Sequence, residues 1–292
     1  MKADVMERAS DASPFAEPDL ELSDRDLQTI TRLVYEKSGI TLGDAKRPLV
    51  VARLQKRLRA GRFASFGDYL KHVGADPSGD ELTALLDAIA TNHTSFFRES
   101  QHFDFIASRI VPEWLARRDG APLTGWSAPC STGEEPYSIV MTLLESVPAA
   151  DHDRIGVEAC DLSTKAVRAA RAGVYPMPRV EGLPRPLLKK YFERGLGEQD
   201  GLVRVRQSVR SRVQIRVRNL LEIQRAERTY DFVFCRNVMI YFDRPVQQRV
   251  VAMLERHLAP GGYLFIAHSE SLNGVQHALE WVAPAIYRKR RT

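Results

Sequence analysis

The sequence lacks any long apolar segment. None of its hydrophobic runs reaches the roughly 18 residues that a membrane-spanning helix requires. Residues 1–19 also lack the apolar core of a secretory signal peptide, because charged and small polar residues interrupt them throughout. These absences argue against a helical membrane protein and against an ordinary secreted protein. We therefore expect a cytoplasmic protein with no direct membrane insertion.

Cysteine is also scarce. The chain has three cysteines, Cys130, Cys160 and Cys235, and neither they nor the histidines show the spacing of a zinc site. We expect free thiols in a reducing compartment and no bound metal. The chain also contains no GxGxxG and neither GxxxxGKS nor GxxxxGKT, the glycine-rich loops that hold dinucleotides and nucleoside triphosphates. Their absence argues against both classes of ligand.

What the sequence does have is an unevenly distributed excess of positive charge. The 42 lysines and arginines exceed the 37 acidic residues and give a formal charge of +5 at pH 7. Residues 45–62 contain no acidic residue and the following basic ones: Lys46, Arg47, Arg53, Lys56, Arg57, Arg59 and Arg62. Such a block favours encounter with an anionic partner, although a solvated helix face is an equally good interpretation of a charge run alone.

Composition and periodicity divide the chain into four stretches. Residues 1–19 are polar without apolar periodicity, which predicts a flexible tail. Residues 20–91 have helical periodicity throughout and predict a helical N-terminal domain. Residues 92–120 are expected to form a linker and a connecting helix, and residues 121–292 an α/β domain. The helices expected before residue 120 span 23–39, the segment after Pro48, Phe66–Val73, Glu81–Ala90 and about Gln101–Arg117.

Strands and helices alternate in the last stretch. The strands expected there are Leu123–Ala128, Arg154–Cys160, Tyr230–Cys235, Gly262–His268 and Val282–Arg288, with helices at about 135–147, 163–172 and 246–258. This alternation is typical of a mostly parallel sheet with crossover helices. The section Tyr191–Val217 departs from it. Its two β-type runs, Leu202–Arg206 and Val213–Val217, are predicted to belong to a small excursion from the main sheet.

The stretch WSAPCSTGEEPYS at 126–138 is predicted to form a strand, a turn and a helix around a ligand. Gly133 makes the turn, and Glu134 and Glu135 open an apolar-periodic helix. A phosphate at a helix N-terminus prefers bare backbone N–H groups and lysine, and carboxylates there would repel it. The stretch therefore suits a cationic or hydroxyl-bearing ligand.

Polar side chains follow the ends of four predicted strands. They are Glu134 with Glu135, Asp161, Asn219, and Arg236 with Asn237. Open parallel sheets bind ligands at these carboxyl ends. Asp161 is placed to accept hydrogen bonds from ribose hydroxyls, although it could equally cap the helix that begins near Ser163. A ribose and a positive group without a phosphate cradle indicate S-adenosylmethionine.

Five segments, in this order and spacing, carry a family resemblance: TNHTSFFRES, WSAPCSTGEEPYS, NLLE, FCRNVMIYFD and APGGYLFIAHSESL. They resemble the chemotaxis receptor methyltransferases of the CheR type, and the resemblance extends from about Leu20 to Arg288. It implies an α/β fold: a Rossmann-like S-adenosylmethionine-dependent methyltransferase domain with a small antiparallel β-subdomain at about 175–217, preceded by an all-helical N-terminal domain. It also implies methyl transfer to glutamate side chains on the cytoplasmic helices of bacterial chemoreceptors, with S-adenosylhomocysteine as the product.

The resemblance implies a role for each matching position. Cofactor-binding residues would be Asn92, Thr94, Arg98, Glu135, Asp161, Asn219, Leu220, Arg236 and Asn237. Of these, Glu135 would bind the methionine end, Asp161 the ribose, and Asn219 with Leu220 the adenine. Arg98 and Tyr241 would be the catalytic pair that faces the acceptor. Arg53, Arg57 and Arg59 would dock the receptor's cytoplasmic helical bundle.

The residue set suits this chemistry without a general base. A glutamate, with an unperturbed pKa of about 4.3, is already ionised at neutral pH. The enzyme must align a carboxylate oxygen with the methyl carbon, and Arg98 can orient that carboxylate while Tyr241 donates to it or touches the methyl group. Each residue also has a structural interpretation. Arg98 could form a surface ion pair with Glu99, and Tyr241 could be ordinary core.

Two rival functions remain at this level. A nucleic-acid or small-molecule methyltransferase fits the basic charge, but the chain lacks the Asn/Asp-Pro-Pro-aromatic motif used on amino groups of bases, and we expect no nucleic-acid partner. The second rival is a non-catalytic adaptor that senses the cofactor product or receptor tails. The presence of Arg98, Asp161 and Tyr241 argues against this alternative. We expect a monomer whose β-subdomain is a second candidate contact, with the receptor's C-terminal peptide.

Overall fold

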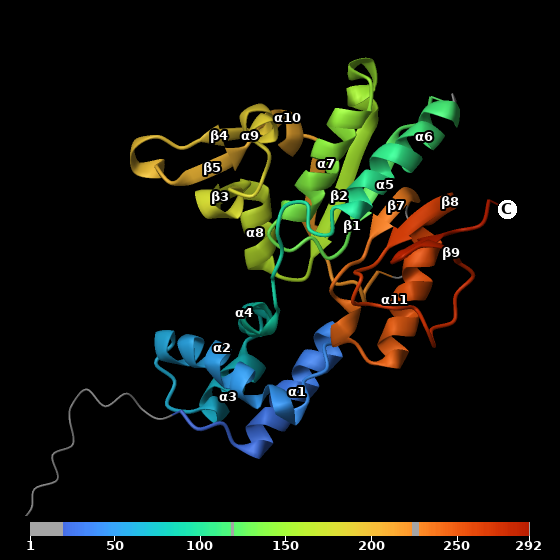
Figure 1. The fold of residues 1–292 in the computed structure, drawn as a ribbon. Helices are drawn as coiled ribbons and strands as arrows, with labels where there is room; N and C mark the ends of the chain where they lie inside the picture. The colour runs from blue at the N-terminus through green and yellow to red at the C-terminus, as the bar shows by residue number, and fades with distance from the viewer. Residues whose placement is uncertain (1–19, 118–119, 224–227, 292) are drawn as a thin grey trace, which may run out of the picture.

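The computed structural model describes residues 20–117, 120–223 and 228–291, so the flexible tail predicted for 1–19 lies outside the described residues. Figure 1 shows the N-terminal helices as a separate lobe below the α/β lobe, with the chain passing upward from α4. No helix of the described residues combines the length and the apolar character needed to cross a membrane.

The N-terminal lobe is all-helical, as predicted. Its helices are α1 (Asp24–Ser38), η1 (Asp44–Lys46), α2 (Arg47–Ala60), α3 (Phe66–Ala75) and α4 (Asp80–Ile89). Ser23 caps α1 by accepting a hydrogen bond from the Asp26 amide, and Gly39 ends the helix in the left-handed conformation. The apolar stripe of α2, which comprises Val50, Leu54 and Leu58, is fully buried in the core of the lobe.

The connecting helix is present but interrupted. It consists of α5 (Gln101–Phe105), the π-helical segment η2 (Ile106–Ile110) and α6 (Val111–Arg117). Pro112 follows the π-helical segment and has no backbone N–H to donate. The amide of Val111 bonds to the carbonyl of Ile106, five residues back. A wider turn at this point accommodates the proline without ending the helix.

A seven-stranded sheet forms the centre of the α/β lobe. Its strands are β1 (Leu123–Ser127), β2 (Ile155–Asp161), β6 (Val213–Val217), β7 (Tyr230–Phe234), β8 (Leu258–Phe265), β9 (Glu280–Ala283) and β10 (Ile286–Arg288). The order is β6-β2-β1-β7-β8-β10-β9; the first five strands are parallel, and β10 is antiparallel to both of its neighbours. Strand order reverses between β1 and β7, which is where open α/β sheets bind ligands.

Helices cover both faces of this sheet. They include α7 (Glu134–Ser146), α8 (Thr164–Ala172) and α11 (Arg244–His257), while the short helices η3 (Ala149–Arg154) and η6 (Met239–Tyr241) lie in the connections. Side chains alternate along each strand: Phe232 and Phe234 pack with the core around α7, whereas Val233 and Cys235 pack with the core around α11. The three cysteines are buried free thiols, as predicted.

A separate three-stranded antiparallel sheet projects from the α/β lobe, at the upper left in Figure 1. Its order is β3-β5-β4, with β3 (Val174–Pro176), β4 (Phe192–Arg194) and β5 (Leu202–Val205), accompanied by η4 (Met177–Arg179), α9 (Arg185–Tyr191), η5 (Gly197–Gln199) and α10 (Gln207–Arg210). This sheet confirms the small antiparallel unit expected from the sequence.

The assignment of Val213–Val217 to the excursion is wrong. This run is β6, which pairs in parallel with β2 from Val157 opposite Val213 to Asp161 opposite Val217. Its apolar alternation is the same for either sheet, so the pattern alone could not decide between them. The helical turn α10 separates it from β5 and returns the chain to the main sheet.

The prediction of a single strand at Val282–Arg288 is also wrong. The structure has two antiparallel strands there, β9 and β10. Pro284 cannot donate to a ladder, and Ala285 adopts a positive φ of 62°, so the chain turns between them. The strand expected to begin at Gly262 starts earlier, at Leu258, and a register irregularity lies in its pairing with β7.

Two strand glycines make a matched test of core packing. A Cβ on Gly125 of β1 would lie 2.1 Å from Cε2 of Phe232, whereas a Cβ on Gly156 of β2 would meet nothing within 4 Å. We expect Gly125→Ala to lower the free energy of unfolding by about 1–3 kcal/mol through overpacking. Gly156→Ala should be neutral or stabilising by up to about 1 kcal/mol. Urea denaturation of both variants measures the difference in their free energies of unfolding. Equal changes in the two variants would contradict the predicted difference in packing.

Candidate functional site

The carboxyl ends of β1, β2 and β7 meet at the point where the strand order reverses. The chain leaves β1 at Ser127, turns through residues 128–133 and enters α7 at Glu134. Gly133 has a φ of 99°, and a Cβ there would lie 2.9 Å from the Cβ of Ala170. Glycine is therefore required both by the backbone conformation and by the close packing of the turn against α8.

Asp161 ends β2 and is nearly inaccessible, with 6% of its surface exposed. Its Oδ2 accepts a hydrogen bond from the Ser131 amide (2.8 Å) and its Oδ1 one from the Ser163 amide (2.9 Å). Burial raises the pKa of the Asp161 carboxyl. Ser163 itself is the N-cap of α8, so the alternative in which Asp161 caps that helix is wrong. Each carboxylate oxygen keeps a lone pair for a further donor.

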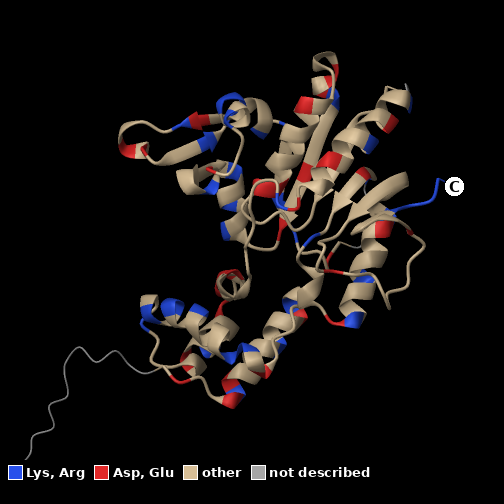
Figure 2. Cartoon of the chain, in the orientation of Figure 1, with Lys and Arg blue, Asp and Glu red and all other residues tan. Residues whose placement is uncertain are grey.

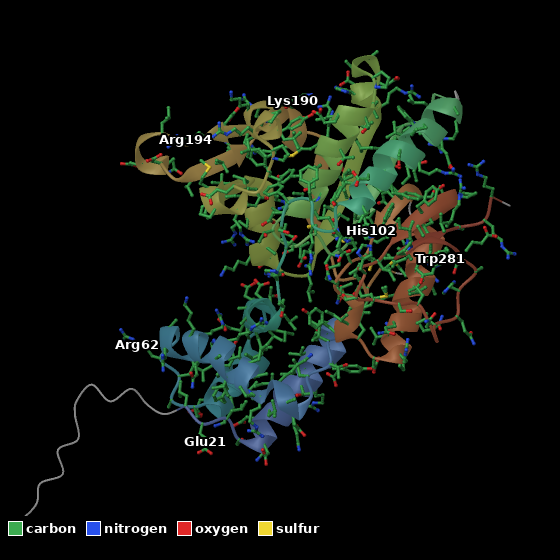
Figure 3. All side chains as sticks on the ribbon, viewed as in Figure 1. Glu21, Arg62, His102, Lys190, Arg194 and Trp281 are labelled. Atoms are coloured by element: carbon green, nitrogen blue, oxygen red, sulfur yellow. The ribbon has the colours of Figure 1, made fainter. Side chains whose placement is uncertain are left out.

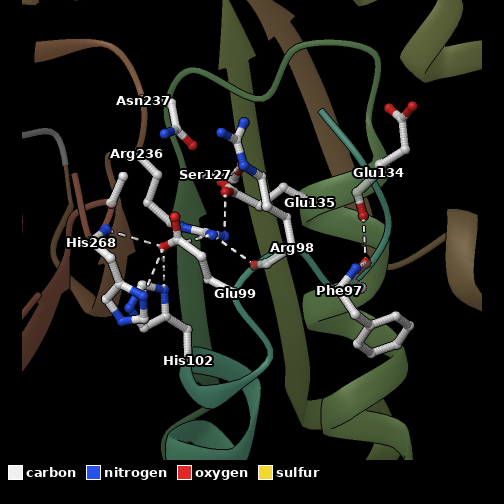
Figure 4. Close-up of polar contacts among 12 residues, drawn as sticks. Phe97, Arg98, Glu99, His102, Ser127, Glu134, Glu135, Arg236, Asn237 and His268 are labelled. Carbon is white, nitrogen blue, oxygen red and sulfur yellow. Dashed lines mark hydrogen bonds and ion pairs between the residues drawn. The ribbon is translucent and has the colours of Figure 1, made fainter. Parts of the chain in front are cut away.

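A buried arginine joins two glutamates across the site. Nη1 of Arg236 lies 3.0 Å from Oε2 of Glu135, and its Nη2 lies 3.0 Å from Oε2 of Glu99 (Figure 4). We call this arrangement the Glu99–Arg236–Glu135 bridge. The hydroxyl of Ser127 donates to the other oxygen of Glu135 at 2.7 Å. The bridge connects β1, α7, the end of β7 and the segment that precedes α5.

The pKa values of the two glutamates of the bridge are shifted in opposite directions. Burial raises the pKa of Glu135, and the attraction of Arg236 only partly opposes it. At Glu99 burial also acts to raise the pKa, but the charge and hydrogen bond of Arg236, together with the hydrogen bond from the His268 amide, outweigh it and the pKa is lowered. The difference follows the depth of each side chain, since Glu135 is 11% and Glu99 18% exposed.

The same bridge holds the junction segment 92–99 against the sheet. Nη2 of Arg236 also donates to the carbonyl of Arg98 at 2.6 Å, and the hydroxyl of Ser138 in α7 accepts the Phe97 amide at 3.0 Å. Phe97 and Glu99 adopt left-handed backbone conformations, with φ values of 52° and 58°. Non-glycine residues persist in this region only when the surroundings impose it, which these contacts do.

Arg98 and Tyr241 both lie at the junction between the lobes. Nη1 of half-buried Arg98 donates to the carbonyl of His93 at 3.0 Å, while the Glu99 carboxylate, its alternative partner, bonds to Arg236. Half-buried Tyr241 lies 5.5 Å from the ammonium of Lys46 and shares a small cavity of about 40 Å³ with that residue and Thr91. Within the described ranges, no hydrogen bond joins Arg98 to Tyr241.

The other predicted cofactor residues differ in how they are engaged. Thr94 is buried and its carbonyl accepts Nη1 of Arg179 at 2.9 Å, whereas Asn92 is half-buried. The Asn219 amide donates to the carbonyl of Lys37 in α1 at 2.6 Å, which ties the end of β6 to the N-terminal lobe. Leu220 follows it in the core, with 9% of its surface exposed.

Asn237 and its neighbours depend on a glutamate that the sequence analysis missed. Glu270 accepts the amides of Asn237 (3.0 Å), Met239 (2.9 Å) and Ala267 (2.9 Å). Burial raises the pKa of Glu270, although the three amides act to lower it. Glu99 was missed in the same way, because its partner Arg236 is far away in the sequence. No local pattern indicates either contact.

The basic residues of α2 are partly used within the lobe. Arg53 donates to the carbonyl of Ile89 and to the hydroxyl of Thr91, at the end of α4. Arg57 forms an ion pair with Glu81 of α4 at 2.6 Å. Arg59 is exposed near the end of α2. The acidic counterpart of this block therefore comes from another helix, which a scan of residues 45–62 could not reveal.

Comparison with known proteins gives concordant results. Residues 25–90 match the family described as CheR methyltransferase, all-alpha domain, and residues 92–287 match CheR methyltransferase, SAM binding domain. Chemotaxis protein methyltransferase 2 of Pseudomonas aeruginosa is 39% identical over 277 residues, which cover 94% of this chain and 96% of that protein. Chemotaxis protein methyltransferase of Salmonella typhimurium is 39% identical over 269 residues, which cover 92% of this chain and 91% of that protein.

We expect the fold to be sensitive to removal of the guanidinium from the bridge. Arg236→Ala would leave Glu99 and Glu135 without their shared cation and should lower the free energy of unfolding by about 3–5 kcal/mol. The exposed pair between Arg194 and Asp200 provides the control, since Arg194→Ala should cost less than about 1 kcal/mol. Guanidinium denaturation of both variants measures the two values, and equal losses would be inconsistent with this role of Arg236.

Proposed function

Because the chain belongs to the CheR methyltransferase family and contains its S-adenosylmethionine-binding domain, we propose that it methylates chemoreceptors. The reaction transfers a methyl group from S-adenosylmethionine to glutamate side chains of their cytoplasmic domains and releases S-adenosylhomocysteine. Both relatives described above are named chemotaxis protein methyltransferases. The observation that carries the proposal is the pair of buried carboxylates, Glu135 and Asp161, at the carboxyl ends of adjacent parallel strands.

The polar groups at this edge of the sheet fit S-adenosylmethionine. The cofactor has ammonium, sulfonium and ribose hydroxyl groups, which call for carboxylates. Two further polar atoms, the Ser131 hydroxyl and Nε of Arg236, are buried without a hydrogen-bond partner among the described residues. A buried polar atom without a partner is costly, so such atoms commonly mark where a ligand or water binds. The edge therefore combines negative charge with unused hydrogen-bonding capacity.

We assign the cofactor contacts as the family positions indicate. Glu135 binds the methionine end, Asp161 binds the ribose, and Asn219 with Leu220 binds the adenine. Asn92, Thr94 and Arg98 contribute from the junction segment, and Arg236 and Asn237 border the cofactor. Arg236 is a positioning residue in this scheme, since its guanidinium holds Glu135. The side-chain amide of Asn219 also donates to the carbonyl of Lys37, which fixes the turn that carries Leu220.

Methyl transfer then requires alignment more than proton transfer. When bound, the cofactor supplies an electrophilic methyl group on a sulfonium. The acceptor glutamate is ionised at neutral pH, with a pKa of about 4.3, so its carboxylate is already the nucleophile. Arg98 orients this carboxylate, and the hydroxyl of Tyr241 donates a hydrogen bond that holds it in line. Correct orientation of this kind can lower the activation barrier by several kcal/mol.

The N-terminal lobe is the proposed docking surface for the receptor's helical bundle. Lysines and arginines gather along α2, as Figure 2 shows. Arg59 is exposed, and Arg53 and Arg57 are half-exposed while engaged with α4. Acidic faces of a receptor bundle would meet this surface first, and the attraction would be weakened by salt. In this proposal, residues 20–91 dock the receptor and residues 121–292 bind the methyl donor.

The small antiparallel sheet is the proposed site for the receptor's C-terminal peptide. Its outer strands, β3 and β4, each pair with β5 on one side only. An extended peptide can add to such an edge through main-chain hydrogen bonds. Leu196, which follows β4, is 83% exposed and could contact an apolar side chain of the peptide. We propose that the protein acts as a monomer in the cytoplasm, where these parts of a receptor are found.

Cofactor binding can be tested at Asp161. Asp161→Asn removes the charge of the side chain but keeps its size. We expect the affinity of this variant for S-adenosylhomocysteine to fall by about 10- to 100-fold, which corresponds to the loss of one or two charged hydrogen bonds. Asp153→Asn is the control, because that carboxylate is 99% exposed and lies just before β2, at its opposite end. Isothermal titration calorimetry measures both; unchanged affinity in Asp161→Asn would remove Asp161 from the cofactor site.

Acceptor chemistry can be tested at Arg98. With radiolabelled S-adenosylmethionine and receptor-containing membranes, we expect wild-type protein to form base-labile methyl esters, and Arg98→Ala to form them on the order of 100-fold more slowly. Arg256→Ala, an exposed arginine on α11, should keep the wild-type rate. A full rate in Arg98→Ala would contradict its role, whereas label that resists base treatment would contradict ester formation itself.

A further inference from the structure

Three ionisable side chains outside the proposed reaction converge beside the bridge. They are Glu99 of the junction segment, His102 of α5 and His268 after β8, and one potential ligand atom from each lies within 4.8 Å of the other two. Nδ1 of His102 lies 3.7 Å and Nδ1 of His268 lies 3.9 Å from Oε2 of Glu99. Figure 4 shows both imidazoles pointing toward this carboxylate.

His102 is the unusual member of this cluster. It is completely buried, yet neither ring nitrogen has a hydrogen-bond partner in the part of the chain that the structure describes. Its ring instead packs edge-on against Phe265. Burial lowers the pKa of His102 to about 4. A buried imidazole with two unpaired nitrogens needs a physical explanation.

The other two members leave room for a ligand. His268 is 38% exposed, so one side of the cluster is open to solvent. Every contact that the described residues make with the Glu99 carboxylate goes to Oε2, which leaves Oε1 for another partner. The cluster thus has a buried nitrogen donor, an accessible nitrogen donor and a carboxylate oxygen on three different segments. Figure 3 places His102 inside the α/β lobe, near the centre of the view.

We propose that Glu99, His102 and His268 form a binding site for one zinc-like divalent transition-metal ion. Two imidazoles and one carboxylate are a ligand set that zinc accepts, with a fourth position left for solvent. Magnesium and calcium prefer oxygen ligands, so this donor set selects against them. Tetrahedral zinc places its donor atoms roughly 3.3 Å apart, closer than the 3.7 and 3.9 Å that separate Nδ1 of His102 and of His268 from Oε2 of Glu99, so metal binding requires these side chains to move closer together.

The site is coupled to the bridge through Glu99. Nη2 of Arg236 lies 3.0 Å from Oε2 of this carboxylate, so the metal ion and the guanidinium draw on the same negative charge. Metal binding therefore weakens the attraction between Glu99 and Arg236 and links metal availability to the junction segment. The histidines are far apart in the sequence and separated by most of the α/β domain, which is why their spacing predicted no metal site.

The experiment uses full-length protein without an affinity tag, treated with a chelator and then dialysed. Zn²⁺ is titrated by calorimetry, and Co²⁺ is titrated as a spectroscopic probe whose visible absorption reports tetrahedral coordination. We expect one equivalent of each ion to bind the wild type. His268→Ala should weaken binding by more than about tenfold and remove the Co²⁺ absorption, because it deletes one ligand. His93→Ala is the control, since His93 is exposed and outside the cluster.

His102→Phe provides a second variant that fills the buried space while removing both nitrogens, and it should also lose the metal. If circular dichroism shows that this variant does not fold, the accessible His268→Ala decides the question. The proposal is overturned if the wild type binds neither ion, or if His268→Ala binds them as tightly as the wild type and His93→Ala do. These readouts are independent of methyl transfer, so a failure of the proposed reaction would not affect them.

Discussion

One buried guanidinium determines how the site is built. Arg236 lies at the end of β7 and bonds to Glu135 on α7 and to Glu99 before α5. An unpaired charge in this position would cost several kcal/mol, so these three segments must be in register for the fold to be stable. The left-handed backbone at Glu99 and the fixed carboxylate of Glu135 both accompany these contacts.

This arrangement separates the two halves of the proposed reaction while keeping them adjacent. The sheet edge provides Glu135 and Asp161, whose negative charge suits the methyl donor. The junction segment provides Arg98, whose positive charge suits a carboxylate acceptor. Because Arg236 also bonds to the backbone of Arg98, the donor and acceptor sides are held by the same residue. Catalysis by alignment requires this kind of fixed relation.

The sequence predicted what depends on local pattern. The alternation of strand-like and helix-like segments predicted the strands at the sheet centre, helical periodicity predicted a helix over residues 23–39, and Asp161 was correctly placed at a strand end. Long-range contacts could not be predicted, because no periodicity encodes them. They include the pairing of β6 with β2, the partner of Glu99, and the use of Asn219 to hold α1. Local sequence patterns therefore predict helices and strands, whereas the candidate site is formed by contacts between elements that are far apart in the sequence.

The most direct test of this account is a double-mutant cycle between Glu99 and Arg236, measured as the free energy of unfolding in the presence of a chelator. The cycle compares Glu99→Gln, Arg236→Met and the double variant with the wild type. We predict that the double variant is about 1–3 kcal/mol more stable than the sum of the single losses implies, because Arg236→Met leaves Glu99 and Glu135 without their cation and the change at Glu99 then removes one of these two unpaired charges. Losses that add to within about 0.5 kcal/mol would contradict the central role of the bridge.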